Sequence, residues 1–211
     1  VVRRALAGAG HGAFAAPVVL DVGDEALDLT LAELTGDALP DLAVAATNAF
    51  MFPSTGDALG QAVTLPGYGF DLPAGDFDGD GDTDLLPCNG VGGPVLLQVA
   101  PGQFAAGTGK YPGPSLPGSV VVDLDADGAL DIVATNNWAI TDDVAVVRGL
   151  GDGTFVVPSS MSTPYLSYSD VLLMDFDLDG HLDLALGVDP HMQNQVEVRA
   201  GAGDGTFASP L

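Results

Sequence analysis

The sequence is poor in positive charge, in cysteine and in long apolar runs. Its 211 residues include 5 lysines and arginines against 29 aspartates and glutamates, which gives a formal net charge of −24. Binding to nucleic acid phosphates or to anionic lipid by charge is therefore not expected. The single cysteine, Cys88, excludes an internal disulfide. No apolar stretch approaches the about 20 residues of a membrane-spanning helix, so we predict no membrane insertion.

What the sequence does contain is a recurring acidic phrase of nine residues. The pattern Asp-x-Asp-x-Asp-Gly-x-x-Asp occupies residues 76–84, 123–131 and 175–183, and a degenerate form occupies residues 33–41. Carboxylates at alternate positions can converge on one hard cation such as Ca²⁺, which takes about six to eight oxygen ligands. The glycine at position six permits the sharp turn that this convergence needs. These four segments hold 16 of the 29 acidic residues, so most of the charge lies in candidate metal loops.

We predict about three bound Ca²⁺ ions, with a fourth in the degenerate loop only if its altered residues still bind. The aspartates at positions one, three, five and nine are the expected side-chain ligands of the intact loops: Asp76, Asp78, Asp80 and Asp84, then Asp123, Asp125, Asp127 and Asp131, then Asp175, Asp177, Asp179 and Asp183. An EF-hand shares the first six positions but needs a Glu at position twelve, where this chain has Pro87, Ala134 and Leu186. The apolar runs after the loops are typical of buried strands, not of helices.

A glycine-rich phrase alternates with the acidic one. Gly-x-Gly-x-Gly-x-Phe occupies residues 8–14, 149–155 and 201–207, with weaker forms at 55–59 and 101–104. Successive phrases are 45, 45, 51 and 52 residues apart. Such a period in a chain without helical periodicity predicts a β-propeller, with one small sheet of strands A to D per repeat. A phosphate-binding loop is not indicated, because no Lys-Ser/Thr pair follows the glycines.

Together the two phrases resemble the FG-GAP/VCBS repeat of integrin α-subunit propellers and of many secreted bacterial and fungal proteins. The resemblance implies an all-β propeller of four-stranded blades with Ca²⁺ in the A–B loops. It also implies main-chain carbonyl ligands at position seven, here Asp82, Ala129 and His181. The degenerate loop has Glu33, Thr35 and Ala38 where the family has Asp, Asp and Gly. Its candidate ligands are Glu33, Thr35, Asp37, Leu39 and Asp41.

The organisation expected is a single propeller, or a section of one, over residues 1–211. Its repeats would cover residues 1–17 in part, then 18–62, 63–107, 108–158 and 159–211. The strands would run C-D, then A-B-C-D three times, then A-B-C. These four to five blades are too few for the usual seven, so we expect part of a larger propeller or one completed by other chains.

The predicted role is an extracellular, calcium-stabilised binding or adhesion module for a protein or glycan. Asparagine beside an aromatic ring suits a sugar, which makes Asn136, Asn137 and Trp138 the candidate ligand site, although Trp138 also fits blade-to-blade packing. The loops look saturated by protein oxygens, so structural rather than catalytic metal is expected and the chain is predicted not to be an enzyme. The alternatives are a structural or assembly role through self-association or further blades, and a section of a secreted polysaccharide lyase.

Overall fold

The computed structural model describes residues 2–3, 19–23, 25–67, 69–89, 92–111, 119–135, 144–156, 159–161, 168–188 and 195–210. Every regular element within these ranges is a β-strand, and every strand pairing is antiparallel. No helix in this part of the chain is long and apolar enough to cross a membrane. The predicted all-β class is therefore confirmed.

The strands form a pair and then four sheets in chain order. The pair consists of β1 (Val2–Arg3) and β2 (Val19–Leu20). The first sheet comprises β3 (Asp28–Ala32), β4 (Asp41–Ala45), β5 (Ala49–Phe52) and β6 (Val63–Leu65). The second comprises β7 (Ala74–Gly75), β8 (Asp84–Leu85), β9 (Pro94–Ala100) and β10 (Gln103–Lys110). The third comprises β11 (Ser119–Val122), β12 (Asp131–Thr135), β13 (Val144–Val147) and β14 (Ser159–Met161). The fourth comprises β15 (Tyr168–Met174), β16 (Asp183–Val188) and β17 (Val196–Arg199).

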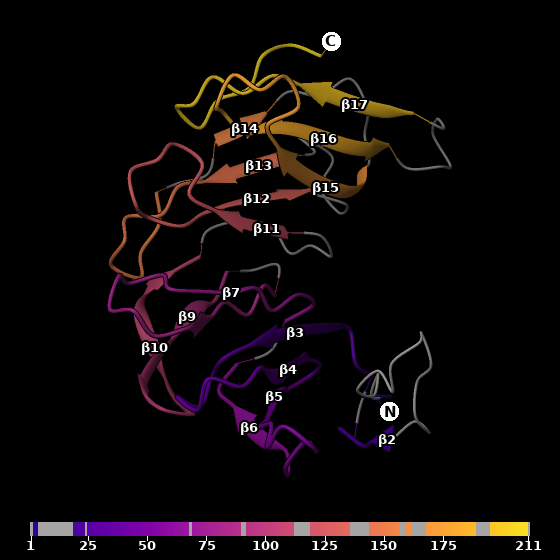
Figure 1. Cartoon of the computed structure of the whole chain (residues 1–211), viewed down its shortest axis with the longest axis vertical. Coiled ribbons are helices and arrows are strands. Elements are labelled where there is room, and N and C mark those ends of the chain that lie inside the picture. Colours follow the sequence, from indigo (N-terminus) through magenta and orange to yellow (C-terminus); the bar gives the residue numbers. More distant parts are fainter. Residues whose placement is uncertain are drawn as a thin grey trace.

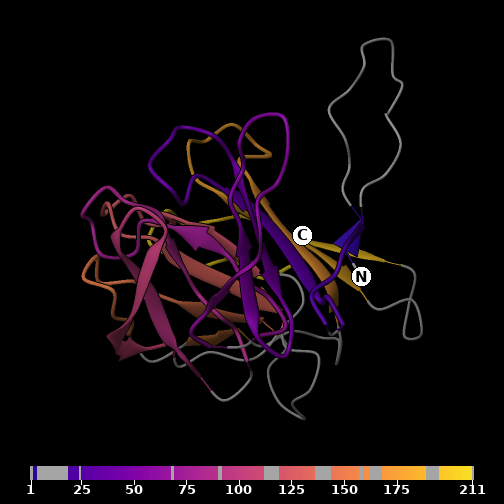
Figure 2. The same cartoon turned by 90° about the horizontal axis from the view of Figure 1, so that it is seen from below.

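This succession of two, four, four, four and three strands agrees with the strand order expected from the sequence. Within each sheet, strands adjacent in sequence lie side by side. The sheets follow one another along the long axis of the molecule (Figure 1), and Figure 2 looks along that axis with the first sheet nearest to the viewer. Among the described residues the buried side-chain clusters join only successive sheets, and none joins the fourth sheet to the first, so the described sheets form no closed ring.

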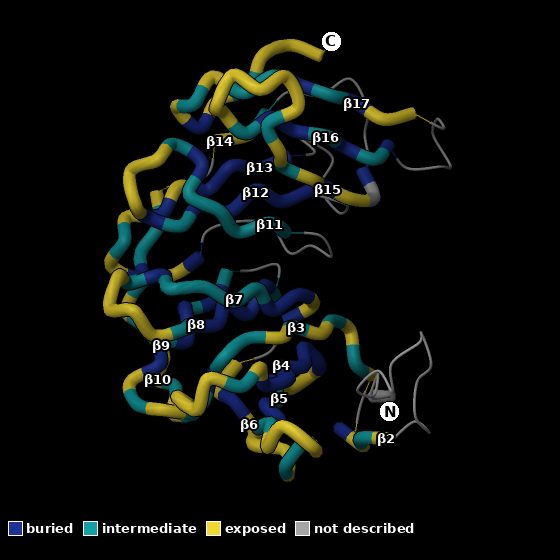
Figure 3. Tube along the Cα trace, in the orientation of Figure 1, coloured by how far each residue is buried: buried dark blue, intermediate teal, exposed yellow. Residues whose placement is uncertain are grey.

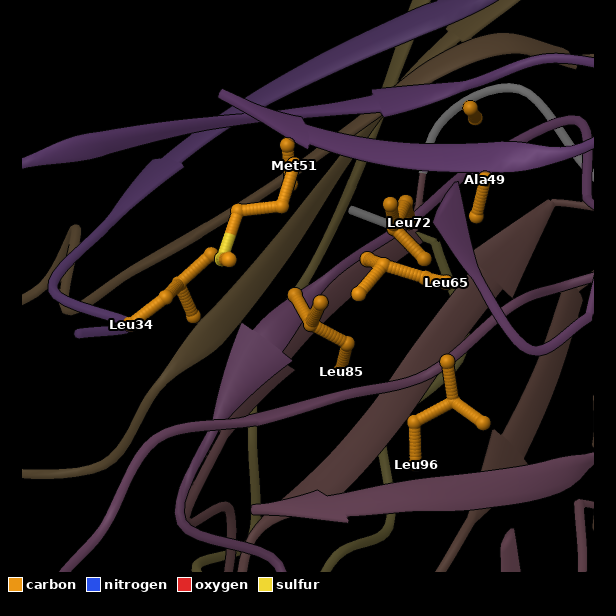
Figure 4. Packing of buried hydrophobic residues seen from close by; sticks show 9 residues of the cluster. Leu34, Ala49, Met51, Leu65, Leu72, Leu85 and Leu96 are labelled. Carbon is orange, nitrogen blue, oxygen red and sulfur yellow. The ribbon is translucent and has the colours of Figure 1, made fainter. Parts of the chain in front are cut away.

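The hydrophobic core is divided among the junctions between successive sheets. Between the first and second sheets, Met51 and Leu65 pack with Leu72, Leu85 and Leu96 (Figure 4). Equivalent clusters join the second sheet to the third and the third to the fourth. Strands in the middle of a sheet are consequently buried on both faces, as the dark stretches of β4, β12 and β13 in Figure 3 illustrate. Each sheet therefore depends on its neighbours for stability.

Phe155 lies before the fourth strand of the third sheet. This strand, β14, begins at Ser159, and Phe155 forms an isolated bridge with Gly149. Its ring packs edge-on against Phe77 and Tyr111, with centroids 5.9 Å apart in both pairs. Phe155 thus closes the glycine-rich turn and anchors it in the junction between the second and third sheets.

Two further side chains are buried, as their environment explains. Cys88 is 1% exposed, and burial raises the pKa of its thiol. Tyr168 is also 1% exposed. Its hydroxyl donates a 2.7 Å hydrogen bond to Glu197, which also pairs with the buried Arg199. Tyr168 therefore satisfies a buried ion pair rather than facing solvent.

Candidate metal centres

The three intact acidic loops each join the first strand of a sheet to the second, and in each of them three carboxylates converge. Within every group the ligand oxygens lie within 4.8 Å of one another. The groups are Asp76, Asp78 and Asp84 in the second sheet, Asp123, Asp125 and Asp127 in the third, and Asp175, Asp177 and Asp183 in the fourth. All nine are among the predicted ligands. The remaining predicted ligands, including the position-seven carbonyls of Asp82, Ala129 and His181, stay predictions.

The backbone of the loops has the sharp turn that the position-six glycine was expected to provide. Gly81, Gly128 and Gly180 have φ angles of 93°, 92° and 94°, in the left-handed region that favours glycine. The degenerate loop keeps this shape, with φ values of 77° at Gly36 and 64° at Ala38. Its backbone therefore has the loop conformation although Glu33, Thr35 and Ala38 stand where the intact loops have Asp, Asp and Gly.

The position-one carboxylate organises each intact loop from within. Asp76, Asp123 and Asp175 each accept a hydrogen bond of 3.0 Å from the backbone N–H of the position-six glycine. A carboxylate oxygen offers two lone pairs, so one such bond leaves capacity for a cation. The loops are thus held in a ligand-ready conformation by their own hydrogen bonds.

The position-nine aspartate ties the loop to the third strand of its sheet. All four copies are at most 2% exposed, and in each copy one oxygen accepts the N–H of position two while the other accepts an N–H at the end of the third strand. The donors are Leu34 and Ser54 to Asp41 (2.9 and 2.6 Å), Phe77 and Gln98 to Asp84 (3.0 and 2.8 Å), Leu124 and Gly149 to Asp131 (3.0 and 2.9 Å), and Phe176 and Gly201 to Asp183 (2.7 and 2.8 Å). The degenerate loop has the same two hydrogen bonds to Asp41. The position-nine aspartate therefore connects the loop to the third strand even where the metal ligands are not all present.

The pKa of the position-nine aspartate is shifted in different directions in different sheets. Burial raises the pKa of Asp84 to about 6 and also raises the pKa of Asp131. In the fourth sheet the backbone hydrogen bonds from Gly201 and Phe176 lower the pKa of Asp183. No fifth sheet covers the fourth among the described strands, so we attribute the difference to weaker desolvation there.

Position three provides the observation that best fits a bound cation. The Oδ1 atom of Asp125 is buried and has no hydrogen-bond partner, and the same holds for Oγ1 of Thr35 at this position of the degenerate loop. Buried oxygens without partners are uncommon and costly. In the loop at 123–131, Asp125 lies beside two further carboxylates, those of Asp123 and Asp127. Ca²⁺ prefers oxygen ligands, so an ion held by this group would give the buried Asp125 oxygen a partner. The residues present therefore fit a calcium ion.

Each loop also touches the glycine-rich turn of the following sheet. Gly102 N donates to Leu34 O at 2.7 Å, and Gly153 N donates to Phe77 O at 2.8 Å. At the third junction Arg148 makes the connection, pairing with Asp125 at 2.5 Å and donating to the carbonyl of Asp204. Two of the three intact loops, at 76–84 and 123–131, thus lie at junctions between successive sheets, where a bound cation would act on the packing of those sheets.

The first glycine of the glycine-rich turn lies too close to a backbone carbonyl of the acidic loop to carry a side chain. A Cβ at Gly149 would lie 2.2 Å from the carbonyl oxygen of Leu130, and one at Gly201 would lie 2.1 Å from that of Leu182. Both carbonyls belong to position eight of the acidic loop in the same sheet. The glycine-rich and acidic phrases recur together because one packs directly against the other.

A cleft of about 270 Å³ lies between the loops of the second and third sheets. It is lined by Asp76, Gly79, Asp127, Gly128, Ala129, Leu150 and Gly151. Its carboxylates belong to the two candidate metal groups, and Leu150 contributes an exposed apolar side chain. The cleft therefore combines metal ligands with a small apolar wall.

A buried acidic cluster at the other end of the sheets was not predicted. Asp71 is 8% exposed and accepts hydrogen bonds from both the N–H and the hydroxyl of Ser119. Leu72 N donates to Asp71 at 2.9 Å and lies 3.3 Å from an oxygen of Asp28. Burial, with a further contribution from Asp28, raises the pKa of Asp71 to about 7. One sequence pattern could have indicated this cluster: an aspartate stands five residues before three of the four acidic loops, at Asp28, Asp71 and Asp170.

The predicted ligand site cannot be placed in the same way. Asn136, Asn137 and Trp138 lie outside the described residues. They follow Thr135, at the end of β12 opposite the acidic loop.

Comparison with known proteins supports the predicted family. Residues 123–186 match the model of the FG-GAP-like repeat, which confirms the resemblance. No curated protein matches the sequence. Similar solved structures include a lectin from Agrocybe aegerita that specifically recognises non-reducing terminal N-acetylglucosamine, with a TM-score of 0.61 and 22% identity over 87% of this chain and 50% of the lectin. They also include the biofilm matrix protein Bap1 of V. cholerae, with a TM-score of 0.54 and 15% identity over 87% of this chain and 28% of Bap1. This chain thus spans half of the lectin or less than a third of Bap1, and these likenesses establish similarity of fold.

Proposed function

We propose that the sheets are blades of a calcium-stabilised β-propeller, and that the chain is part of an extracellular recognition or adhesion module for glycans. The observation that carries the metal part is the convergence of three carboxylates in each of three loops, of which those at 76–84 and 123–131 lie where successive sheets meet. The FG-GAP-like repeat and the fold shared with a lectin and a biofilm matrix protein support the recognition part.

Calcium would act here by holding sheets together rather than by catalysis. Asp123, Asp125 and Asp127 would hold the ion in the third sheet, and the convergent groups of the second and fourth sheets would do so there. Without a cation, the three carboxylates of each group repel one another at short range. Binding would remove this repulsion and secure the loop against the turn of the next sheet. Sites of this extracellular type fill near millimolar Ca²⁺, which favours a location outside the cell.

Removal of calcium is expected to destabilise the protein. For dissociation constants of about 10⁻⁴ to 10⁻³ M and about 1 mM Ca²⁺, each site contributes about 0.4 to 1.4 kcal/mol, or about 1 to 4 kcal/mol for three sites. The melting temperature should fall by several degrees in EDTA and recover with Ca²⁺. Asp125→Ala should remove one ion from the stoichiometry measured by isothermal titration calorimetry. An unchanged melting temperature in EDTA would exclude structural calcium.

Arg148 is expected to weaken calcium binding in the third sheet. Its guanidinium already pairs with Asp125, so it competes with a cation for that carboxylate. Arg148→Met keeps much of the aliphatic stem and removes the charge, which should raise the Ca²⁺ affinity of this loop about threefold to tenfold. A calcium titration of the variant in an Asp78→Ala, Asp177→Ala background would isolate the loop. Equal affinities with and without the arginine would contradict the prediction.

The glycan part of the proposal is tested at the candidate ligand site. Asparagine side chains provide directed hydrogen bonds to hydroxyl groups, and a tryptophan ring stacks on the C–H face of a sugar. Trp138→Ala is expected to abolish retention on the glycans that the wild-type protein selects from an array, with N-acetylglucosamine-terminated glycans as the first probes. The melting temperature of the variant should stay near that of the wild type. Loss of stability with unchanged glycan retention would instead assign Trp138 to packing.

A further inference from the structure

The degenerate loop at 33–41 keeps its shape without a convergent group of carboxylates. All nine of its residues are described, and its acidic side chains form no group of three such as each intact loop has. Its backbone nevertheless has positive φ angles at positions four and six, as in all three intact loops. A different set of interactions must therefore hold this loop in the same conformation.

The carboxylate of Glu33, at position one, binds the backbone of the loop. Its Oε1 atom accepts hydrogen bonds from three successive backbone N–H groups, which are those of Thr35, Gly36 and Asp37, at 3.0, 2.5 and 3.1 Å. In the intact loops the two oxygens of the position-one aspartate accept one backbone N–H each. A carboxylate oxygen offers two lone pairs, so three donors leave Glu33 Oε1 no capacity for a cation.

The other candidate side-chain ligands of this loop are fewer and less charged than those of an intact loop. Position three is the neutral Thr35, where the intact loops have aspartate. Asp41 at position nine accepts one N–H on each oxygen, and Asp37 at position five accepts the N–H of Leu39. Ca²⁺ takes about six to eight oxygen ligands, and its affinity depends on how many of them are charged. These residues therefore do not fit a calcium ion as those of the intact loops do.

We infer that Glu33 takes the place of a cation in the loop at 33–41, which binds no calcium. In an intact loop a cation would gather oxygens at the centre, whereas here one negative oxygen gathers N–H groups. The loop packs on the turn of the second sheet, where Gly102 N donates to Leu34 O and a Cβ on Gly36 would lie 3.1 Å from Pro101. This contact between the first and second sheets therefore does not depend on calcium.

Melting curves of Glu33 variants in calcium and in EDTA test this role. Glu33→Ala should lower the melting temperature by at least about 3 °C, and equally in both buffers, because it removes a charged acceptor from three N–H groups. Glu33→Gln keeps an acceptor oxygen at the same reach and should recover most of this loss. Asp37→Ala, in the same loop, is the control and should lower the melting temperature less. A Glu33→Ala effect that appears only in calcium, or that is no larger than that of Asp37→Ala, overturns the inference.

Thr35 supplies a second test, because its Oγ1 atom is buried and has no hydrogen-bond partner. If no cation binds there, this oxygen costs stability whether or not calcium is in solution. Thr35→Val removes the oxygen and keeps the shape of the side chain, so it should raise the melting temperature equally in calcium and in EDTA. A rise in EDTA that is lost in calcium would mean that Thr35 holds a cation, contrary to the inference.

Counting bound calcium by equilibrium dialysis completes the experiment. A variant that combines Glu33→Asp, Thr35→Asp and Ala38→Gly has the intact motif and should bind one ion more than the wild type. A companion with only Thr35→Asp and Ala38→Gly keeps Glu33 and should bind no additional ion. A combined variant that gains no ion, or a companion that gains one, overturns the inference. This count rests on the proposed calcium sites of the intact loops. A wild-type protein that binds no calcium would refute those sites, and the melting curves in EDTA would still decide the role of Glu33.

Discussion

Asp41→Ala is expected to destabilise the protein by about 2 to 5 kcal/mol, with or without calcium. The substitution leaves the buried N–H groups of Leu34 and Ser54 without their acceptor, and each unsatisfied buried group costs about 1 to 3 kcal/mol. Asp41 is fully buried and belongs to the degenerate loop, so its loss isolates the hydrogen-bonding role of position nine from metal binding. Chemical denaturation in EDTA measures the effect directly.

Asp37→Ala provides the control for this prediction. Asp37 lies in the same loop, and its side chain accepts an exposed 2.9 Å hydrogen bond from Leu39 N, while its backbone N–H, which alanine keeps, donates to Glu33. The expected loss in EDTA is below about 1 kcal/mol. If Asp41→Ala proves too unstable to purify, Asp41→Asn retains one of the two acceptor oxygens and should give an intermediate loss. A destabilisation by Asp41→Ala that disappears in EDTA would mean that the residue acts through a cation.

Asp71→Asn is expected to stabilise the protein by about 2 to 4 kcal/mol above neutral pH, and much less near pH 4. Burial raises the pKa of Asp71 from 3.8 to about 7, so the folded state binds a proton that the unfolded state has released. Wild-type stability should therefore fall as pH rises between about 4 and 7 and change little through this group above that range. An asparagine cannot ionise and avoids this loss.

The surroundings of Asp71 can accommodate the amide. The asparagine oxygen can accept from Ser119, while its NH₂ group can donate to Asp28 and Leu72 N keeps its contact with Asp28. Denaturation curves at several pH values should show a variant-minus-wild-type difference that grows with pH. Asp170→Asn, at the equivalent but exposed position of the fourth sheet, should give no such growth. A pH-independent difference at Asp71 would show that its carboxyl is not protonated in the folded state.

Much of the architecture followed from local patterns. The period of the two phrases predicted the sheets and their strand order, because hairpin loops and turns depend on residues close together in sequence. The same reasoning located the convergent carboxylates, since alternate side chains of a tight loop point toward one centre. Gly81, Gly128 and Gly180 have the left-handed backbone expected from their place in the motif.

Other parts of the candidate site depend on strands that are distant in sequence. Asp131 was interpreted only as a metal ligand, but its second hydrogen-bond donor, Gly149, is 18 residues away and is brought close by the third strand. Asp71 meets Ser119 across 48 residues because successive sheets stack, and no local pattern reports that burial. Tyr168 similarly finds Glu197 only within the folded fourth sheet.

Spacing and turn chemistry were enough to predict the repeating unit and the oxygen-rich loops, because both act within a few residues. The folded sheets were needed to show which aspartates also accept hydrogen bonds from the backbone of a distant strand, and where burial raises the pKa of a carboxyl. Each of these depends on how closely one repeat packs against the next, and therefore on contacts between residues that the chain itself keeps far apart.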